Sequence, residues 1–475
     1  MVRLTRSRGR RIGPKGESAS SADDQRPGGE PAQVASPEPM RVIVVGAGIA
    51  GLTAADAARC AGAEVLVVEA RDRIGGRIRT VPLGPGTVDL GGAWIHSPIG
   101  NPVAEALAVA GIATRNDGAY GAPMAVWADG WMEAPGTTTV TSALQADWDP
   151  AEALAAIPQS DRFVDGVEWF LADRGLDGPL AELARFALVW IVGALVIAGP
   201  PDRISLAGAA AYAKGSGGNL VPAGGYVALV DLLAAGLEVR LGATVTRIEH
   251  GGAQVSVVTD SGTFEGDHAI VTVPLGVLRA GAVTFDPPLP GSHASAVEHL
   301  AMGTEEKVVF RFSERFWPDS VWEITHVAED RAFPAWFDFS RHVGAPALVA
   351  LYNPHSTPGL AQMPAEDRVD AALDVLRKMF GSVPGPDEAL ATDWTGDPCS
   401  LGSYSYVPIG ASVDDMRSLG EPVSEKLALA GEVTVPDCYG TVQAAFVSGL
   451  RAAGLVMGTR PERLSFGIVP PHWCS

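Results

Sequence analysis

The chain has 475 residues, 47% hydrophobic and 19% charged, a composition typical of an ordered globular protein large enough for two domains. Its formal net charge of −20 disfavours nucleic-acid binding, because an acidic surface repels the phosphate backbone. Its four cysteines, Cys60, Cys399, Cys438 and Cys474, are too few and too irregularly spaced for a disulfide framework or a zinc site. We therefore expect a reducing, cytoplasmic setting and no metal.

The first 39 residues are rich in arginine and then in Ser, Pro, Gly and Glu. Such a segment buries too little apolar surface to fold, so we expect a disordered extension. Arg10 and Arg11 are not followed by an apolar stretch, which disfavours an export signal. The longest apolar run, 14 residues from Phe186 to Gly199, is shorter than the ~20 of a membrane span. It predicts a buried helix lining a pocket, with an interfacial segment as the alternative.

The first strand is expected at Arg41–Val45, and an Ala-rich helix follows it. Between them stand three glycines in a G-x-G-x-x-G array, Gly46, Gly48 and Gly51. A second apolar run ends at Glu69, 18 residues after Gly51. The glycines let the backbone approach a pyrophosphate at the helix N-terminus, and the acid can accept hydrogen bonds from a ribose. The motif continues to Gly75-Gly76-Arg77, an extension that the larger dinucleotide FAD needs.

Further elements are expected along the rest of the chain. Residues 116–215 look like an inserted helical region. Four strands are then expected to return to the nucleotide sheet, broken by hairpins: Glu238–Leu241, Thr244–His250, Gln254–Thr259 and Ala269–Val273. Two more strands and a helix follow: Lys307–Phe312, Ala347–Leu351 and Ala365–Phe380. A last strand near Ala428 and a helix near Val442 lead back to the cofactor.

These patterns predict an α/β fold in which a Rossmann-like FAD-binding domain is interleaved with an α+β substrate-binding domain. The FAD-binding domain is assigned residues 40–115, 216–295 and 393–462. The substrate-binding domain is assigned residues 116–215 and 296–392. Residues 1–39 are the disordered N-terminal extension, and residues 463–475 form a C-terminal tail.

Together the motifs resemble the flavin-containing amine oxidases, a family that includes monoamine oxidases, polyamine oxidases and lysine-specific histone demethylases. The resemblance runs from residue 41 to about residue 460. Its carriers, in family order, are GAGIAGL, EARDRIGGR, DLGGAWIH, LVPAGGY, AIVTVPLGVL, MGTEEKV, DWTGDP-CSLGSYSYVPIG and LAGEVTVPDCYGTVQAAFVSGLRAAG. The polyamine oxidases are the branch with the most similar motifs.

The resemblance implies which residues hold FAD. The ADP half would be held by Gly46, Ala47, Gly48, Gly51, Glu69, Ala70, Arg71, Gly76 and Arg77. The backbone of Val245 would meet the adenine, and Glu432 would contact the central part of the cofactor. Thr441 and Val442 would cap the pyrimidine end of the flavin from a helix start. The isoalloxazine would be lined by Gly92, Ala93 and Trp94, with Trp394 nearby.

The resemblance also implies catalytic residues. Lys307 matches the lysine that the family places, through a water, at flavin N5; without the match, it would be read as lying on the solvent face of a strand. Tyr404 matches a tyrosine of the aromatic cage, whose second position is Thr441, as in the demethylase and polyamine branch. Ser403 stands where monoamine oxidases carry the cysteine that bonds FAD, and Cys399 lies four residues earlier. Non-covalent FAD is therefore expected.

The substrate is predicted from Ala93-Trp94-Ile95-His96, which lacks the arginine that grips a carboxylate in amino-acid oxidases. His96 resembles the histidine with which polyamine oxidases bind a cationic amine; the alternative is a structural bond to the turn at Pro98. We expect hydride transfer from a small polyamine-like amine to the flavin, with O2 as acceptor, giving an aldehyde, an amine and H2O2.

Other functions remain open. A biosynthetic oxidase or desaturase of a secondary-metabolite amine, or a monoamine oxidase, would use the same motifs. A partner-binding flavoprotein of the demethylase kind is disfavoured, because no long helical insertion is recognised in the sequence. The oligomeric state is not predicted.

Overall fold

The computed structural model describes residues 39–116, 124–128, 131–133, 148–212, 218–319, 321–357 and 359–474. The chain divides into two units, residues 1–38 and 39–475, and all described helices and strands belong to the second. The predicted disordered extension thus lies outside the described residues except for Pro39. The predicted α/β class is confirmed, since helices alternate with strands of several sheets.

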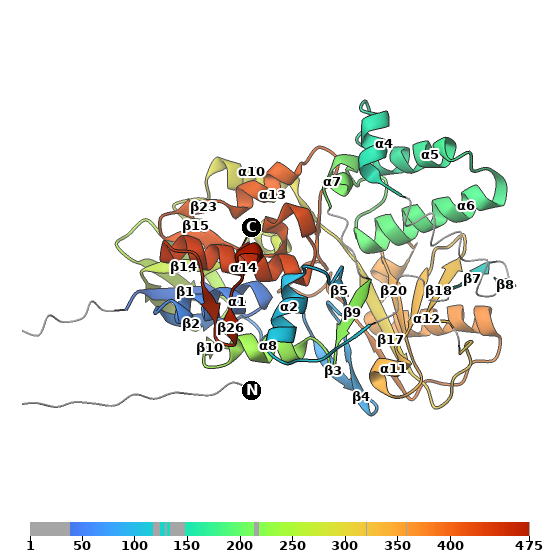
Figure 1. The fold of residues 1–475 in the computed structure, drawn as a ribbon, viewed down its shortest axis with the longest axis horizontal. Coiled ribbons are helices and arrows are strands. Elements are labelled where there is room, and N and C mark those ends of the chain that lie inside the picture. Colours follow the sequence, from blue (N-terminus) through green and yellow to red (C-terminus); the bar gives the residue numbers. More distant parts are fainter. Residues whose placement is uncertain are drawn as a thin grey trace, which may run out of the picture. The chain divides into compact units, whose positions relative to one another are not determined.

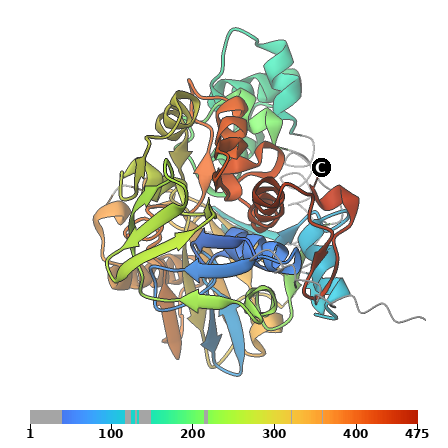
Figure 2. The same ribbon diagram turned by 90° about the vertical axis from the view of Figure 1, so that its left-hand side faces the viewer.

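A six-stranded sheet carries the glycine motifs (Figures 1 and 2). Its order is β10 (Glu238–Arg240), β2 (Glu64–Val68), β1 (Arg41–Val45), β14 (His268–Val271), β24 (Leu427–Leu429) and β23 (Pro422–Ser424). The first five strands are parallel, and β23 runs antiparallel at one edge. In both β1 and β2 the last four residues are buried, because a central parallel strand is covered on both faces.

Helices α1 (Ile49–Cys60) and α14 (Val442–Met457) pack against each other beside this sheet. They approach closely at Gly449, where a β-carbon would lie 2.4 Å from the carbonyl oxygen of Ala50. The same core contains residues of α2 (Pro102–Val109) and α8 (Val227–Ala234). Any side chain at Gly449 would therefore push α14 away from α1.

A separate four-stranded sheet corrects one prediction. Its order is β13 (Gly262–Gly266), β12 (Val255–Thr259), β11 (Val245–Glu249) and β15 (Thr284–Asp286). Strands β10 and β14 do join the nucleotide sheet, but the strands predicted at Thr244–His250 and Gln254–Thr259 do not. Residues of β12 alternate between buried and half-buried, which is typical of a strand covered on one face. Such a strand fits an outer hairpin better than the centre of a parallel sheet.

A seven-stranded sheet follows the order β21 (Glu388–Ala391), β17 (Glu306–Arg311), β20 (Ala347–Tyr352), β19 (Ala335–Asp338), β18 (Glu323–Val327), β7 (Met124–Ala128) and β8 (Trp131–Glu133). Strands β17 and β20 match their predicted positions within one residue at each end. Helix α12 has the predicted bounds, Ala365–Phe380. Residues 116–215, which were predicted to be a helical region, also contain two strands, β7 and β8, which complete this sheet.

Side chains of β17 alternate between two cores. Val308 and Phe310 belong to the core that α12 covers. Val309 belongs to the core that contains Phe337 and Phe339. Because successive side chains of a strand point to opposite faces, Lys307 shares its face with Val309, and Glu306 shares its face with Val308.

Most of the apolar run at 186–199 is helical, as predicted, but the helix begins earlier and ends at Val196. Helix α6 (Gly178–Phe186) continues directly into the π-helix η1 (Ala187–Val196). Among the described residues this is the one helix long and apolar enough to cross a membrane, and half of its most apolar window is buried in the protein. Asn353, which follows β20, donates its Nδ2 to the carbonyl oxygens of Ala194 and Ala198, at 3.0 and 3.2 Å. The end of η1 is therefore tied to the large sheet.

The remaining described elements are short. The other helices are α4 (Pro150–Ala156), α5 (Phe163–Asp173), α7 (Leu206–Ala211), α9 (Leu275–Arg279), α10 (Gly291–His299), α11 (Ser340–Val343), α13 (Val413–Gly420), η2 (Leu360–Gln362), η3 (Glu432–Thr434), η4 (Pro436–Cys438) and η5 (Pro471–Cys474). The other strands are β3 (Thr80–Leu83), β4 (Gly86–Asp89), β5 (Ile95–His96), β6 (Thr114–Asn116), β9 (Asn219–Pro222), β16 (Ala301–Met302), β22 (Ser405–Tyr406), β25 (Arg463–Leu464) and β26 (Gly467–Ile468).

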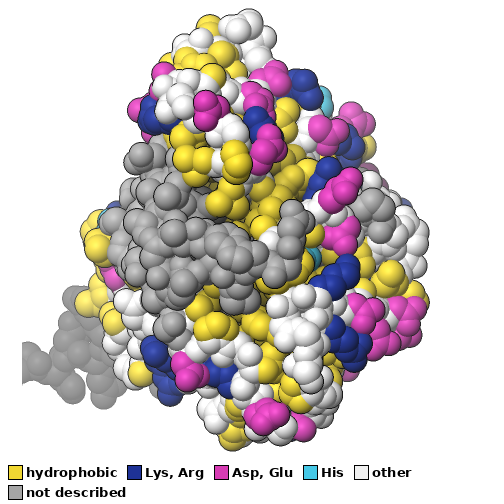
Figure 3. Space-filling view, turned by 90° about the vertical axis from the view of Figure 1, so that its right-hand side faces the viewer, with side chains coloured by type: hydrophobic (Ala, Val, Ile, Leu, Met, Phe, Trp, Pro, Cys, Tyr) yellow, Lys and Arg dark blue, Asp and Glu magenta, His cyan; other side chains and the backbone are white. Residues whose placement is uncertain are grey.

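Hydrophobic side chains gather on the face shown in Figure 3, where acidic and basic side chains are interspersed around them. Exposed apolar residues of the α6–η1 helix include Leu180 and Val196.

Candidate functional site

Two glycine loops meet at the end of β1. Gly46 has a φ of +101°, and a β-carbon on Gly51 would lie 1.9 Å from the carbonyl oxygen of Gly46. The second loop packs on the first through the amide of Gly75, which donates to the carbonyl of Ala47 at 2.8 Å. The nearest atoms to a β-carbon on Gly48 would be backbone atoms of Gly75 and Gly76, at 3.9 Å or more. Backbone of the two loops therefore meets closely at this corner, and the hydroxyl of Thr272 packs against Gly46 and Gly51.

The N-terminus of α1 opens into the same corner. Gly48 is its N-cap residue, and among the described residues no side chain caps this end and no acidic residue stands in the first turn. The first N–H groups of a helix have no partner within the helix and carry partial positive charge. This end of α1 can therefore receive an anionic group such as a pyrophosphate.

Glu69 ends β2 beside these loops. Its buried carboxylate accepts from the amides of Ala47 at 2.7 Å and Arg71 at 2.9 Å. The backbone carbonyl of Glu69 accepts from the amide of Ala243 at 2.9 Å, which brings the start of β11, with Val245, alongside. Glu69 and Val245 are thus brought together, and Ala70 lies between Glu69 and Arg71.

Two arginines link the glycine loops to residues 397–432. Arg71 pairs with Asp397 at 2.6 Å and donates to the hydroxyl of Ser400 at 2.8 Å. Arg77 pairs with Glu432 at 2.9 Å and donates to the carbonyl of Ser403 at 3.0 Å. Each guanidinium has five N–H donors, so these bonds leave donors for a phosphate.

Glu432 and its neighbours join three segments. Besides Arg77, its carboxylate binds the hydroxyl of Ser405 at 2.6 Å and the amide of Gly440 at 2.9 Å. The preceding residue, Gly431, is buried with a φ of +145°, yet a β-carbon there would meet no atom within 4 Å. A buried glycine that faces empty space marks room for a bound group. Together with the open end of α1 and the glycine corner, it shows that these residues fit a dinucleotide.

Lys307 lies inside the protein, only 5% exposed, which contradicts the solvent-face alternative. Its Nζ donates to the carbonyl oxygen of Gly91 at 2.5 Å and of Asp89 at 3.3 Å. The ammonium also lies 4.9 Å from the ring centre of Trp94, within the range of a cation–π contact. Burial lowers the pKa of Lys307, although Glu305 and Asp89 act in the opposite direction.

Tight packing places the predicted flavin-lining residues together. A β-carbon on Gly91 would lie 1.7 Å from the carbonyl oxygen of Arg77. One on Gly92 would lie 2.9 Å from the side chain of Val442. The indole N–H of Trp394 donates to the carbonyl oxygen of Leu90, the residue before Gly91, at 3.3 Å. Gly92, Trp94, Trp394, Val442 and Lys307 therefore surround one region, and Ala93 lies between two of them in the chain.

Tyr404 joins this region to the π-helix. Its hydroxyl donates to the carbonyl oxygen of Leu195 in η1, and its own carbonyl accepts from the amide of Gly303 at 2.6 Å. Gly440 packs closely on the Tyr404 ring, because a β-carbon on this glycine would lie 2.9 Å from the ring. Thr441 is the next residue in the chain. The Thr441 hydroxyl caps α14 by accepting from the amide of Ala444 at 3.1 Å. Burial raises the pKa of Tyr404.

His96 is exposed and lies next to Trp94, with ring centres 6.5 Å apart. Its Nδ1 lies 2.9 Å from the amide oxygen of Asn219, and its backbone carbonyl accepts from Asn101 at 2.9 Å. The ring bond to Asn219 differs from the predicted bond to the turn at Pro98. The Trp94 ring is therefore a neighbour of both His96 and Lys307.

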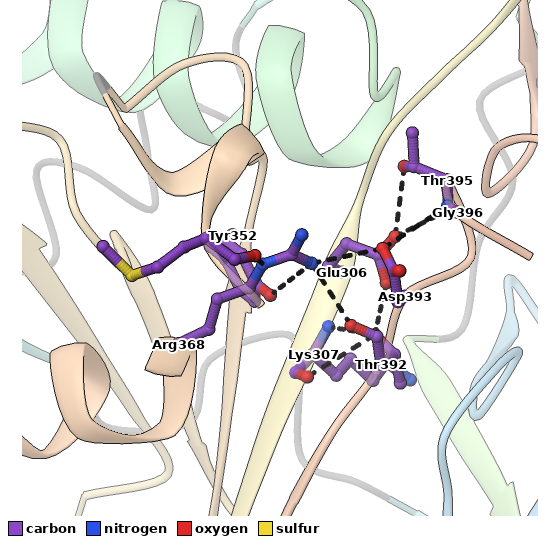
Figure 4. A network of polar contacts seen from close by, with 9 residues as sticks. Glu306, Lys307, Tyr352, Arg368, Thr392, Asp393, Thr395 and Gly396 are labelled. Carbon is purple, nitrogen blue, oxygen red and sulfur yellow. Dashed lines mark hydrogen bonds and ion pairs between the residues drawn. The ribbon is translucent and has the colours of Figure 1, made fainter. Parts of the chain in front are cut away.

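Sequence reasoning missed a buried polar network behind Lys307 (Figure 4). Glu306, fully buried, binds the hydroxyl of Thr392 at 2.5 Å and the amide and hydroxyl of Thr395 at 3.0 and 3.1 Å. The Thr392 hydroxyl in turn accepts from the amide of Lys307 at 2.8 Å. Arg368 lies 3.4 Å from Asp393 in the same network. The network fixes the backbone from which Lys307 projects.

The comparisons with known proteins agree with this geometry. Residues 49–457 match the family model described as flavin containing amine oxidoreductase, and the chain belongs to this family. This membership confirms FAD as the cofactor.

The relatives of this chain include demethylase homologues and polyamine oxidases. The chain is 33% identical, over 89% of its length, to "Lysine-specific histone demethylase 1 homolog 1" of Oryza sativa subsp. japonica, and covers 53% of that protein. It is 31% identical to "Polyamine oxidase 4" and 30% identical to "Polyamine oxidase 3" of the same organism, over 87% and 86% of its length, and covers 88% of each. The chain thus spans about half the length of this demethylase homologue and most of each of the two polyamine oxidases.

Proposed function

We propose that this chain is an FAD-dependent oxidase that cleaves a C–N bond of a polyamine-like amine, with O2 as acceptor. The products are an aldehyde, a smaller amine and H2O2. The observation that carries the proposal is the buried Lys307 beside Trp94, held by two backbone carbonyls in a flavoprotein family of amine oxidoreductases. The coverage of the two polyamine oxidases, 88% of each, supports this substrate class.

Each of the two proposed domains is built around one of the two large sheets. The six-stranded sheet with α1 and α14 forms the Rossmann-like FAD-binding domain, assigned residues 40–115, 216–295 and 393–462. The seven-stranded sheet and the helices α4 to α7 form the substrate-binding domain, assigned residues 116–215 and 296–392. The glycine corner and the open end of α1 support the first assignment. The contact of Tyr404 with η1 supports a site between the two.

The proposed roles extend from the adenine end to the flavin end. Glu69 binds the ribose beside Val245, and Arg71 and Arg77 share their donors with the phosphates. Gly92, Ala93, Trp94, Trp394, Thr441 and Val442 line the flavin. Tyr404 and Lys307 complete the reaction site, and His96 binds the cationic amine from its entrance. The remaining cofactor contacts are those of Gly46, Ala47, Gly48, Gly51, Ala70, Gly76 and Glu432.

The chemistry follows from these positions. FAD, when bound, accepts a hydride from the carbon next to the amine nitrogen and passes the electrons to O2. Trp94, Phe337 and Phe339 form an aromatic wall, with ring centres 5.4 and 5.5 Å from that of Trp94. Such a wall disfavours an ammonium by desolvation and favours the neutral amine that reacts. Lys307 holds a water or a proton at Nζ, because burial lowers its pKa toward the working range.

The demethylase homologues favour a second candidate, a methylated lysine in a protein. A biosynthetic oxidase or a monoamine oxidase would retain the same reaction centre. We also propose a cytoplasmic location, which is supported by three free cysteines, Cys60, Cys399 and Cys438, among the described residues.

Peroxide release on a panel of amines tests the proposal. Purified protein loaded with FAD is given spermine, spermidine, putrescine, aromatic amines, amino acids and a dimethyl-lysine peptide. We expect turnover with spermine or spermidine at least about tenfold above the other compounds. Turnover with the peptide alone would support the demethylase candidate instead, and turnover with amino acids alone would overturn the proposed substrate class.

A further inference from the structure

A second carboxyl lies beside the candidate reaction site. Glu305 stands immediately before β17, two residues before Lys307, and each of the two groups acts on the pKa of the other. Two hydrogen bonds fix the backbone here. The amide of Glu305 donates to the hydroxyl of Ser403 at 2.9 Å, and the amide of Gly303 donates to the carbonyl of Tyr404 at 2.6 Å. Glu305 is thus held against both proposed reaction-site residues, Lys307 and Tyr404.

Glu305 and its neighbour Glu306 differ in what surrounds them. Glu306 is fully buried, and its oxygens are occupied by Thr392 and Thr395. Glu305 is half-buried, and Lys307 and Tyr404 both lower the pKa of its carboxyl. Within the described residues it takes part in no ion pair. Glu305 therefore keeps accessible surface that the enclosed Glu306 lacks.

The groups around Glu305 affect its protonation state. A phenol has one hydrogen, and Tyr404 directs it at the carbonyl oxygen of Leu195, which can only accept. Tyr404 and Lys307 both lower the pKa of the Glu305 carboxyl and therefore favour its ionised form. When Glu305 is ionised, its oxygens need another donor, and a protonated substrate amine is such a donor.

We infer that Glu305 is the base that takes the proton from the substrate's ammonium group before oxidation. The inference rests on the proposed function. In this step an N–H bond of the ammonium breaks, its electron pair stays on nitrogen, and an O–H bond forms on Glu305. The products of the step are a neutral amine and a neutral carboxyl. The proton leaves to solvent with product release.

Several charged groups act on Glu305. Burial raises its pKa to about 7, Glu306 acts in the same direction, and Lys307 and Tyr404 oppose it. Glu432 and Tyr212 face Tyr404, and Asp89 faces Lys307. An aliphatic amine has a pKa of about 10 in water, roughly three units higher. Desolvation disfavours the ammonium–carboxylate pair relative to the neutral pair, which reduces this difference.

The pH dependence of a Glu305→Gln variant tests the inference, using the best amine of the panel. The wild-type kcat/KM should fall about tenfold per pH unit below pH 7, because the carboxylate is lost as pH falls through the raised pKa. The variant should be at least about 100-fold slower at pH 7.5. It should recover to within about tenfold at pH 10.5, where solution supplies neutral amine. Glu305→Asp should restore activity at pH 7.5 with a shifted acid limb.

Two further measurements separate chemistry from folding. Infrared titration of the holoenzyme between pH 5 and pH 9 should show a protonated carboxyl that disappears near pH 7 and is missing in Glu305→Gln. Exposed Glu265 provides the matched control: Glu265→Gln removes one negative charge and should leave the pH profile unchanged. FAD content and Tm should match wild type in all three variants.

The outcomes are distinguishable. If the wild type oxidises no amine, the proposed function falls and the inference with it. If the wild type oxidises an amine and the Glu305→Gln profile runs parallel to it at every pH, only the inference falls. An infrared carboxyl signal that titrates near pH 7 and is unchanged in size in Glu305→Gln would also overturn it.

Discussion

At the scale of single residues, the surroundings of Lys307 are unlike those of a surface lysine. Among the residues that the structure describes, two lysines each donate to a pair of backbone carbonyls: Lys307 to Asp89 and Gly91, and Lys426 to Gly252 and Ala253. Lys426 does so in contact with solvent, whereas Lys307 does so inside the protein, beside Trp94. The same hydrogen bonds therefore hold a solvated charge in one case and a desolvated one in the other.

Replacing Lys307 by Met should lower the rate of amine oxidation or of reoxidation by at least about 100-fold, the usual size of an acid–base contribution. Met keeps the length of the side chain but removes the nitrogen that holds the proton. Rapid-mixing absorbance measurements with the amine, and separately with O2, identify which of the two half-reactions is slowed. Lys426→Met, which also removes a lysine bonded to two carbonyls, should leave both rates within twofold. Equal rates in Lys307→Met and wild type would remove the proposed role.

The sequence predicted part of this site. The position of Lys307 was expected from a family motif, and its burial could not be predicted, because an isolated lysine in an apolar strand also suits a solvent-facing side. Glu305 was missed for a related reason. It differs from Glu306 only in which groups of Thr392, Thr395 and Tyr404 reach it, and those residues are about a hundred positions away in the chain. Spacing along a sequence does not encode such contacts.

At the scale of elements, the first helix depends on the absence of a side chain at Gly51. A β-carbon there would lie 1.9 Å from the carbonyl oxygen of Gly46, a backbone atom that cannot rotate away. Gly51→Ala should therefore destabilise the protein by about 1–3 kcal/mol despite the better helix propensity of alanine. It should also lower the FAD bound per polypeptide, because the loop at Gly46 must shift. Tm and flavin absorbance measure the two effects.

Gly291→Ala is the matched control for this change. Gly291 is the first residue of α10, and a β-carbon there would meet no atom within 4 Å. Alanine should leave the FAD content unchanged and leave Tm unchanged or slightly raised. Unchanged FAD content and Tm in Gly51→Ala would show that the glycine corner is not tightly packed.

Elements were predicted well where periodicity alone decides them, as for β1, β17 and α12. Sheet membership was predicted less well. The strands β11 and β12 have the apolar residues of any strand, and their pairing depends on hairpins that keep them together. Strand β7 lies alongside β18 in parallel although about 200 residues separate them in the chain. No local pattern distinguishes such a pairing from an independent hairpin.

At the scale of the whole molecule, the net charge of −20 predicts how the enzyme meets its substrate. Charges of both signs are interspersed on the face in Figure 3, so the attraction of a cation arises from the overall excess. At 0.1 M salt the screening length is about 10 Å, which removes most of this long-range attraction. We expect kcat/KM for spermine to fall about three- to tenfold between 20 and 200 mM KCl. Stopped-flow rates at low amine concentration measure it.

A monocationic amine is the control for this measurement, since the effect scales with substrate charge. Its kcat/KM should change by less than about twofold over the same range of salt. Equal salt dependence for both amines would mean that the acidic composition does not guide the substrate.

The alternation of β17 between two cores has a consequence for insertions and deletions. Glu306 and Lys307 are neighbours with opposite surroundings: one is enclosed by threonines, and the other lies against an aromatic ring. Losing one residue from the turn at Gly303 while the strand keeps its length would exchange the two faces. A carboxylate would then enter the aromatic region and an ammonium the threonine pocket. The length of that turn is thus as strict a requirement as the identity of the lysine, although no single substitution would reveal it.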